Sequence, residues 1–182
     1  VGVANKNGYV PVNIDDGYVY IGYKTFVNVT PQTQYVYPNE TFSVNITIDP
    51  GEPIVGAQMD IDFNSSVTTA MSISDGGMFD IWYGATIDNI NGTVKNMLGF
   101  NIGGDTENIS GVFATIEFVA ISNGTLNLSN IQLVNAKAEE IPIIAIVTNN
   151  GTFIIPDNIP PEITDNTPSS ATTGAVSYTH LR

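Results

Sequence analysis

The stretch Phe42–Ile48, FSVNITI, alternates apolar and polar side chains without interruption. Successive side chains of a β-strand point to opposite faces, so this alternation predicts a strand with one buried and one solvated face. The solvated half also contains the Asn-x-Thr pattern at Asn45, which is an acceptor sequence for N-glycosylation. A segment of this kind favours a fold in which each β-sheet has one face buried in the core and one face in water.

Similar segments recur along the chain, and no segment shows a convincing helical apolar stripe. Candidate strands lie at residues 23–30, 41–48, 56–63, 67–73, 85–90, 93–100, 111–120, 124–134 and 151–156. Between them stand Asn91-Gly92, Asn123-Gly124 and Asn150-Gly151, dipeptides that tolerate the positive φ of tight turns. Many short strands separated by turn residues are typical of an antiparallel β-sandwich, so an all-β fold is predicted.

Two segments predict which side chains face outward. In GAQMDIDF one face is apolar, and the opposite face presents Gln58, Asp60 and Asp62. In GVFATIEF the same alternation places Phe113 on the outer side. The sequence therefore predicts an ordinary apolar core and an outer face that is acidic and rich in amides.

The net charge of −13 excludes some classes of partner. Only five residues are Lys or Arg, so no basic patch could hold a phosphate backbone, which excludes nucleic acid as a partner. An anionic membrane surface is disfavoured for the same reason. No apolar run reaches the roughly 20 residues that a transmembrane helix needs, so membrane insertion is not expected.

The chain offers few groups for catalysis. It has no cysteine and one histidine, His180, so disulfides, thiolate metal sites and histidine-based catalytic sets are not expected. Glycosidases need only a pair of carboxylates. The acids that could supply such a pair by number are Asp60, Asp62, Asp80, Asp88, Asp105 and Glu117. Because solvated acids are the ordinary state of such a surface, the chain is not expected to be an enzyme.

Calcium needs only oxygen ligands, and two turns could supply them. They are Asp15-Asp16-Gly17 and Gly104-Asp105-Thr106-Glu107. Neither has the spaced ligands of an EF-hand loop, so each is interpreted as a plain turn. No metal site and no cofactor are predicted for this chain, although bound calcium stays an open alternative.

N-glycosylation acceptor patterns are more frequent than composition predicts. About three are expected by chance, and nine occur. They stand at Asn28, Asn39, Asn45, Asn64, Asn91, Asn108, Asn123, Asn127 and Asn150. The excess favours an extracellular or cell-surface glycoprotein, and the alternative is a turn composition rich in Asn and Thr.

One cluster of aromatic residues raises a separate possibility. GGMFDIWYG places Trp82 beside Tyr83, with Phe79 close by. Carbohydrate-binding modules present aromatic platforms to sugar rings, so Trp82 and Tyr83 are an alternative glycan site. The other interpretation is that Met78, Phe79 and Trp82 close one end of the sandwich.

The two ends of the chain differ from its middle. VNIDDGYVYIG at 12–22 is similar to VTNNGTFIIPD at 147–157, so residues 1–23 are interpreted as closing strands of a preceding module or as an extra N-terminal hairpin. Residues 157–174 are rich in Pro and Thr and predict a linker or the start of an immunoglobulin-like module. The last eight residues, 175–182, resemble a translated sequencing adapter. The chain is interpreted as an internal fragment of a longer modular protein.

The middle of the chain, about residues 24–156, resembles the cohesin family. The resemblance rests on DPGEPIVGAQMDIDFNSSVTTAMSISDGGMF (49–79), followed in order by GVFATIEFVA (111–120), GTLNLSNIQLVNA (124–136) and NNGTFII (149–155). It implies a jelly-roll β-sandwich of about nine strands that docks a dockerin-like module on one flat sheet face. Dockerins are calcium-binding modules, so it also implies that calcium belongs to the partner.

The resemblance also implies which residues contact the partner. In cohesins polar side chains of the third strand do so, which here are Gln58, where the family pattern has Asn, and Asp60. Asp62 extends the same acidic face, and Leu98 matches a position of another contacting strand. If Asn45 is glycosylated, its strand cannot be part of this face, and the hypothesis that follows is that Asn45 and Gln58 lie in different sheets.

Overall fold

The computed structural model describes residues 2–5, 8–15, 18–21 and 23–157, and from residue 23 onward they form two β-sheets packed face to face. The strands of this sandwich are β4 (Thr25–Thr30), β5 (Thr33–Tyr35), β6 (Thr41–Asp49), β7 (Ile54–Phe63), β8 (Thr68–Asp75), β9 (Ile81–Asp88), β10 (Thr93–Phe100), β11 (Gly111–Ala120), β12 (Gly124–Asn135), β13 (Ile146–Asn149) and β14 (Gly151–Ile154). One turn of 3-10 helix, η1 (Ile143–Ala145), precedes β13.

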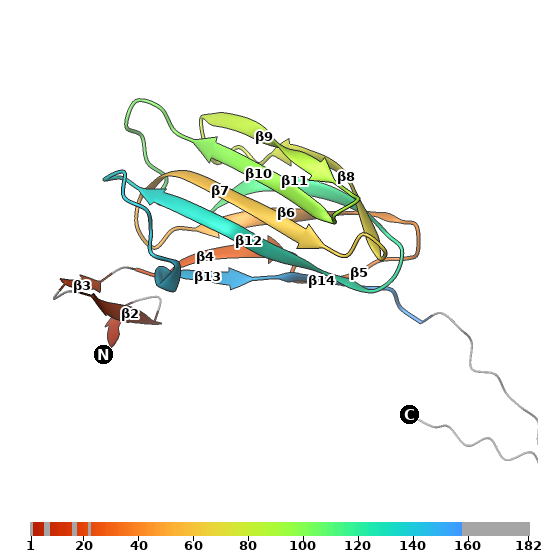
Figure 1. The fold of residues 1–182 in the computed structure, drawn as a ribbon, viewed down its shortest axis with the longest axis horizontal. Coiled ribbons are helices and arrows are strands. Elements are labelled where there is room, and N and C mark those ends of the chain that lie inside the picture. Colours follow the sequence, from red (N-terminus) through yellow and green to blue (C-terminus); the bar gives the residue numbers. More distant parts are fainter. Residues whose placement is uncertain (1, 6–7, 16–17, 22, 158–182) are drawn as a thin grey trace, which may run out of the picture.

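The six-stranded sheet has the order β5-β14-β12-β7-β10-β9, and the five-stranded sheet has the order β13-β4-β6-β11-β8. Figure 1 shows β12, β7 and β10 side by side in front of β6 and β11. The predicted all-β sandwich is confirmed. Because β6 and β7 lie in different sheets, the prediction that Asn45 and Gln58 lie in different sheets is also confirmed.

The sandwich has eleven strands rather than about nine, and its sheets are not purely antiparallel. The two additional strands arise because the first and last strands of the sandwich each break and pass from one sheet to the other. β4 and β13 pair in parallel in the five-stranded sheet, and β5 and β14 do so in the six-stranded sheet. The first break falls at Pro31, which has no N–H for a ladder hydrogen bond.

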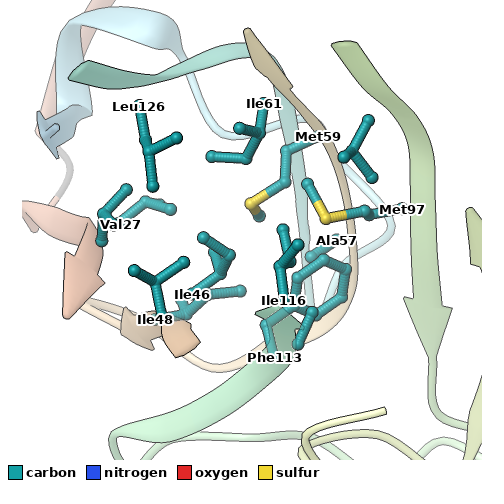
Figure 2. Packing of buried hydrophobic residues seen from close by; sticks show 14 of the residues in the cluster. Val27, Ile46, Ile48, Ala57, Met59, Ile61, Met97, Phe113, Ile116 and Leu126 are labelled. Atoms are coloured by element: carbon teal, nitrogen blue, oxygen red, sulfur yellow. The ribbon is translucent and has the colours of Figure 1, made fainter. Parts of the chain in front are cut away.

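The core fills the space between the sheets. The predicted inner residues of 41–48 and 56–63 are all buried. Figure 2 shows Ala57, Met59 and Ile61 of β7 facing Ile46 and Ile116 of the other sheet. The alternation in these two segments therefore predicted the buried side of both sheets.

Phe113 corrects one of the sequence predictions. It was expected on the outer side of β11, but it is 1% exposed. The register between β11 and β6 shifts between Val112 and Ala114, so Phe113 is the extra residue of a bulge and turns inward. Its ring packs edge-on against Phe79 and Trp82, with centroids 5.9 and 5.3 Å apart.

Residues 2–21 contain β1 (Gly2–Asn5), β2 (Gly8–Asp15) and β3 (Tyr18–Ile21), which form a separate antiparallel sheet in the order β1-β2-β3. Whether these strands close a preceding module or form an added hairpin stays a prediction. Asp16 and Gly17 of the first calcium candidate, nearly all of the predicted linker and the whole of 175–182 lie outside the described residues.

Candidate functional site

The outward side of β12, β7 and β10, here called the β7 face, carries the predicted partner-binding residues. Gln58 lies in the middle, with Leu98 of β10 and Gln132 of β12 as its register partners. Gln58 and Leu98 are half-buried, and Gln132 is exposed. Amides and an apolar side chain thus stand together at the centre of this face.

Asp60 points to the same side but is not exposed as alternation predicted. Its side chain is 6% exposed. One carboxylate oxygen accepts a hydrogen bond from the backbone N–H of Asn96, and the other accepts one from Nδ2 of Asn130, both at 2.7 Å. A carboxylate can be buried at low cost only where donors meet it. The expected exposure of Asp60 is wrong, and its contact with a partner stays a prediction.

Both hydrogen-bond donors stand where the neighbouring strands lose register with β7. The shift in β10 falls between Val94 and Met97, and the shift in β12 falls between Ser129 and Gln132. Asn96 and Asn130 have φ values of 58° and 48°, in the left-handed region that Asn adopts more readily than most residues. Asp60 therefore holds a bulge on either side of the central strand.

The β7 face is hollowed rather than flat. A groove of about 670 Å³ is lined by Asp60, Asn96 and Asn130, and also by Ile143 and Ile146. A second hollow of about 330 Å³ is lined by residues around Gly56 and Phe100. Gln58 and Gln132 line both, so the two depressions form one continuous surface.

Asp62 lies toward the other end of the same face. It is half-buried, and its register partners are Thr93 of β10 and Asn127 of β12. The four predicted residues, Gln58, Asp60, Asp62 and Leu98, are thus brought together on two adjacent strands. Their roles in binding stay predictions.

Sequence reasoning missed the contributions of Asn96, Asn130 and Gln132. A signal for the two bulges is present, because the apolar alternation changes phase within each strand. In β12 it passes from Leu126 to Leu133, and in β10 from Val94 to Met97, in each case across an odd number of residues. An odd step in a period-2 pattern requires one extra residue, which is a bulge.

The two rings of the alternative glycan site lie in different surroundings. Trp82 packs against the buried Phe113, and Phe79 packs against the same ring, so both rings contact the core. Tyr83 is 70% exposed and stacks on Phe100, with ring centroids 5.7 Å apart. Only Tyr83 of the pair is therefore well exposed to a ligand.

Several of the remaining acidic candidates accept hydrogen bonds from neighbouring strands or loops. Glu117 accepts from Ser72, and Glu107 of the second calcium candidate accepts from Nδ2 of Asn101 at 3.1 Å. Within the part of the chain that the structure describes, no cluster of three or more acidic or histidine side chains is placed to hold a metal ion. Among the same residues, no helix is long and apolar enough to cross a membrane.

Asp88 ends β9 and organises the turn into β10. The side-chain amide of Asn91 donates to one of its oxygens at 2.7 Å, and the backbone N–H groups of Asn91 and Ile90 donate to the other. These hydrogen bonds, the one from the Asn91 side chain first, hold the pKa of Asp88 below its ordinary value. The acid therefore supports a turn, and its stabilising effect is lost only as pH falls through that lowered pKa.

The glycosylation candidates are distributed unevenly between the two sheet faces. Asn28 and Asn45 lie on the outer side of the five-stranded sheet, where Asn45 accepts a hydrogen bond from Thr115. Asn127 is the candidate on a strand of the β7 face. The others stand between strands, namely Asn39, Asn64, Asn91, Asn108, Asn123 and Asn150.

Comparisons with known proteins place this arrangement in a wider group. Residues 27–172 match the sequence model of the cohesin domain. No curated protein sequence matches the chain. Similar solved structures include the third cohesin of ScaC from Acetivibrio cellulolyticus, in complex with the ScaB dockerin. It has 19% identity and a TM-score of 0.61, and the match covers 72% of this chain and 98% of that one.

Two further structures have the same fold. A non-cellulosomal cohesin from the archaeon Archaeoglobus fulgidus has 13% identity and a TM-score of 0.60, with 72% of this chain and 91% of that chain covered. A type I cohesin–dockerin complex from Clostridium thermocellum has 12% identity and a TM-score of 0.61, with 72% and 92% covered. At these identities the likeness shows the fold.

Proposed function

The chain belongs to the cohesin domain family, and from this premise we propose that it is a protein-recognition module that docks a dockerin-type partner on the β7 face. The observation that carries the proposal is the arrangement at the centre of this face, where Gln58 lies between Leu98 and Gln132 and borders two depressions. Several similar structures are described as cohesins in complex with dockerins.

The chemistry of the β7 face fits non-covalent recognition. Interfaces combine an apolar, well-packed centre with polar groups that exchange hydrogen bonds across a rim. Leu98 and Phe100 are partly exposed apolar side chains, and the amides of Gln58, Gln132 and Asn101 line the same depression. We place any calcium on the dockerin-type partner, in keeping with the resemblance, and assign no reaction to this chain.

Capture of the chain by immobilised dockerin modules tests the proposal. We expect the full chain to be retained by at least one member of a diverse dockerin panel in calcium and released by a chelator, because dockerins are calcium-binding modules and metal binding is coupled to folding in small domains. Retention by none of the modules, or retention that is indifferent to the chelator, would contradict the proposal.

We further propose an extracellular or cell-surface location, supported by the nine acceptor patterns. If the β7 face docks a protein, a glycan at Asn127 would obstruct it, whereas glycans at Asn28 and Asn45 would not. Glycopeptide mass spectrometry of the natively produced protein should therefore find occupancy at Asn45 and little at Asn127. Full occupancy at Asn127 together with retained dockerin binding would refute this assignment of the faces.

Two alternatives receive less support. A carbohydrate-binding role would rest on Tyr83 stacked on Phe100, because Trp82 packs against the core. Retention of the chain on a polysaccharide, abolished by Tyr83→Ala and indifferent to dockerin, would favour it. A role as a structural spacer would be favoured if neither ligand class binds.

A further inference from the structure

The hollow near Gly56 is formed by the absence of a side chain on the central strand. On the outward side of β7, Gly56 has Phe100 of β10 and Val134 of β12 as its register partners. Both neighbours carry apolar side chains, and both line the hollow as its two walls. The hollow of about 330 Å³ lies among these residues, and Leu98 and Gln58 continue its lining toward the centre of the β7 face.

The backbone itself favours glycine at this position. A Cβ added to Gly56 would lie 3.1 Å from Cβ of Phe100 and 3.3 Å from the carbonyl oxygen of Gly99. Contacts this short require the neighbouring strand to move. The close approach of β10 to β7 thus leaves no room for a side chain at Gly56, and the floor of the hollow is backbone alone.

The lining of the hollow carries no charge, although the chain as a whole has a net charge of −13. Its lining side chains are apolar, apart from the amides of Gln58, Gln132 and Asn101. A charged group placed there would lose hydration without finding an ion partner. An uncharged apolar group would bury its surface against Phe100 and Val134 and be favoured.

We infer that this hollow is an anchor pocket that receives one uncharged apolar side chain, aliphatic or aromatic, of the docked partner. The inference rests on the proposed docking at the β7 face and specifies its chemistry. It commits to the dockerin-type partner as occupant because the hollow is continuous with the centre of that face through Gln58 and Gln132. Anchors in pockets of this kind carry most of the affinity in many protein interfaces.

A small-molecule titration tests the pocket without any partner. The probe is 4-methylphenol, and the charged control is 4-hydroxybenzoate, each added to the isotope-labelled full chain and followed by NMR. We expect 4-methylphenol to shift the amide signals of Gly56, Leu98 and Val134, and the carboxylate to leave them unchanged. Shifts confined to other surfaces, equal shifts with both probes, or no shifts would overturn the inference.

Three variants connect those shifts to the shape of the hollow. Val134→Phe should fill it and Phe100→Ala should remove one wall, so each should weaken the probe at least tenfold. Val134→Thr keeps the volume and should weaken it only about threefold, since it replaces one methyl by a hydroxyl. Circular dichroism of each variant checks that it remains folded, and undiminished probe binding in folded Val134→Phe and Phe100→Ala overturns the pocket.

The same variants separate the pocket from the proposed function. With a dockerin module that retains the native chain, Val134→Phe should lower affinity at least tenfold and Val134→Thr by less than about threefold. Dockerin binding that is equal for the native chain and Val134→Phe would overturn the anchor pocket and leave the docking function intact. Probe binding at Gly56 without any dockerin binding would instead refute the docking function.

Discussion

Asp60→Ala is expected to lower the free energy of unfolding by about 2–4 kcal/mol. The substitution removes two hydrogen bonds at 2.7 Å to a buried carboxylate. It leaves the backbone N–H of Asn96 without its acceptor and releases the side chain of Asn130. Each of these residues is in the left-handed region within a bulge, so both bulges should loosen and the β7 face should lose its shape.

Urea unfolding followed by circular dichroism measures this effect, with Asp62→Ala as the matched control on the same strand and face. Asp62 is more exposed than Asp60, so its replacement should cost less than about 1 kcal/mol. Asn130→Gly keeps the left-handed backbone accessible and removes only the side-chain donor, so it should cost about 1 kcal/mol. If Asp60→Ala is no more destabilising than Asp62→Ala, the carboxylate does not hold the bulges.

This structural role changes how Asp60 can be used as a probe of binding. A loss of partner affinity in Asp60→Ala would report a distorted surface as readily as a lost contact. Gln58 and Leu98 are better probes because neither side chain holds a bulge in place.

Leu98→Asp is expected to weaken dockerin binding by about 100-fold or more, since an unpaired charge desolvated at an interface costs several kcal/mol. Leu98 is half-buried at the centre of the β7 face, beside Gln58 and the hollow at Gly56. An aspartate there would be covered by the docked partner and would also add to a negative charge that is already large. Isothermal titration calorimetry with a captured dockerin module measures the change.

Thr41→Asp provides the matched control for charge. Thr41 is exposed at the start of β6, in the five-stranded sheet, so the same added charge should change affinity less than about threefold. A comparable loss of affinity from both substitutions would indicate a general effect of net charge. A loss from Thr41→Asp alone would move the docking site to the other sheet.

The alternation of apolar residues predicted most of the sandwich, because period-2 patterns follow directly from burial of one sheet face. The ranges expected for 93–100 and 111–120 coincide with β10 and β11, and 41–48 differs from β6 by one residue. The partition of Asn45 and Gln58 between sheets was also predicted. Along the uninterrupted parts of these segments, the apolar alternation decides which side chains face the core.

The predictions were wrong where the backbone departs from regular alternation. Phe113 turns inward because a bulge adds one residue to β11, and Asp60 is covered because bulges bring Asn96 and Asn130 over it. Such features depend on pairing between strands distant in sequence. The short strands β5 and β13 escaped prediction for a similar reason, since each is defined by its partner in the other half of the chain.

Candidate site residues were predicted less completely than the fold. The family resemblance identified Gln58 and Leu98 as candidates. The hollow beside them depends on the missing side chain of Gly56, which the apolar alternation does not reveal. For Trp82 the sequence allows both a core role and a ligand role, and the contact with Phe113 shows that its ring packs against the core. The local sequence indicates which side chains are polar or apolar. The pocket, in contrast, forms only when β7, β10 and β12 pair in one register, and a single segment does not show that pairing.

The most direct test of the account is methyl NMR of the full chain as a calcium-loaded dockerin module is added. We predict that the methyl signals of Leu98 and Val134 shift on binding, while those of Thr47 and Thr115, in the five-stranded sheet, stay unchanged. Adding a chelator should restore the spectrum of the free chain. Shifts at Thr47 and Thr115 with none at Leu98 and Val134 would contradict docking on the β7 face.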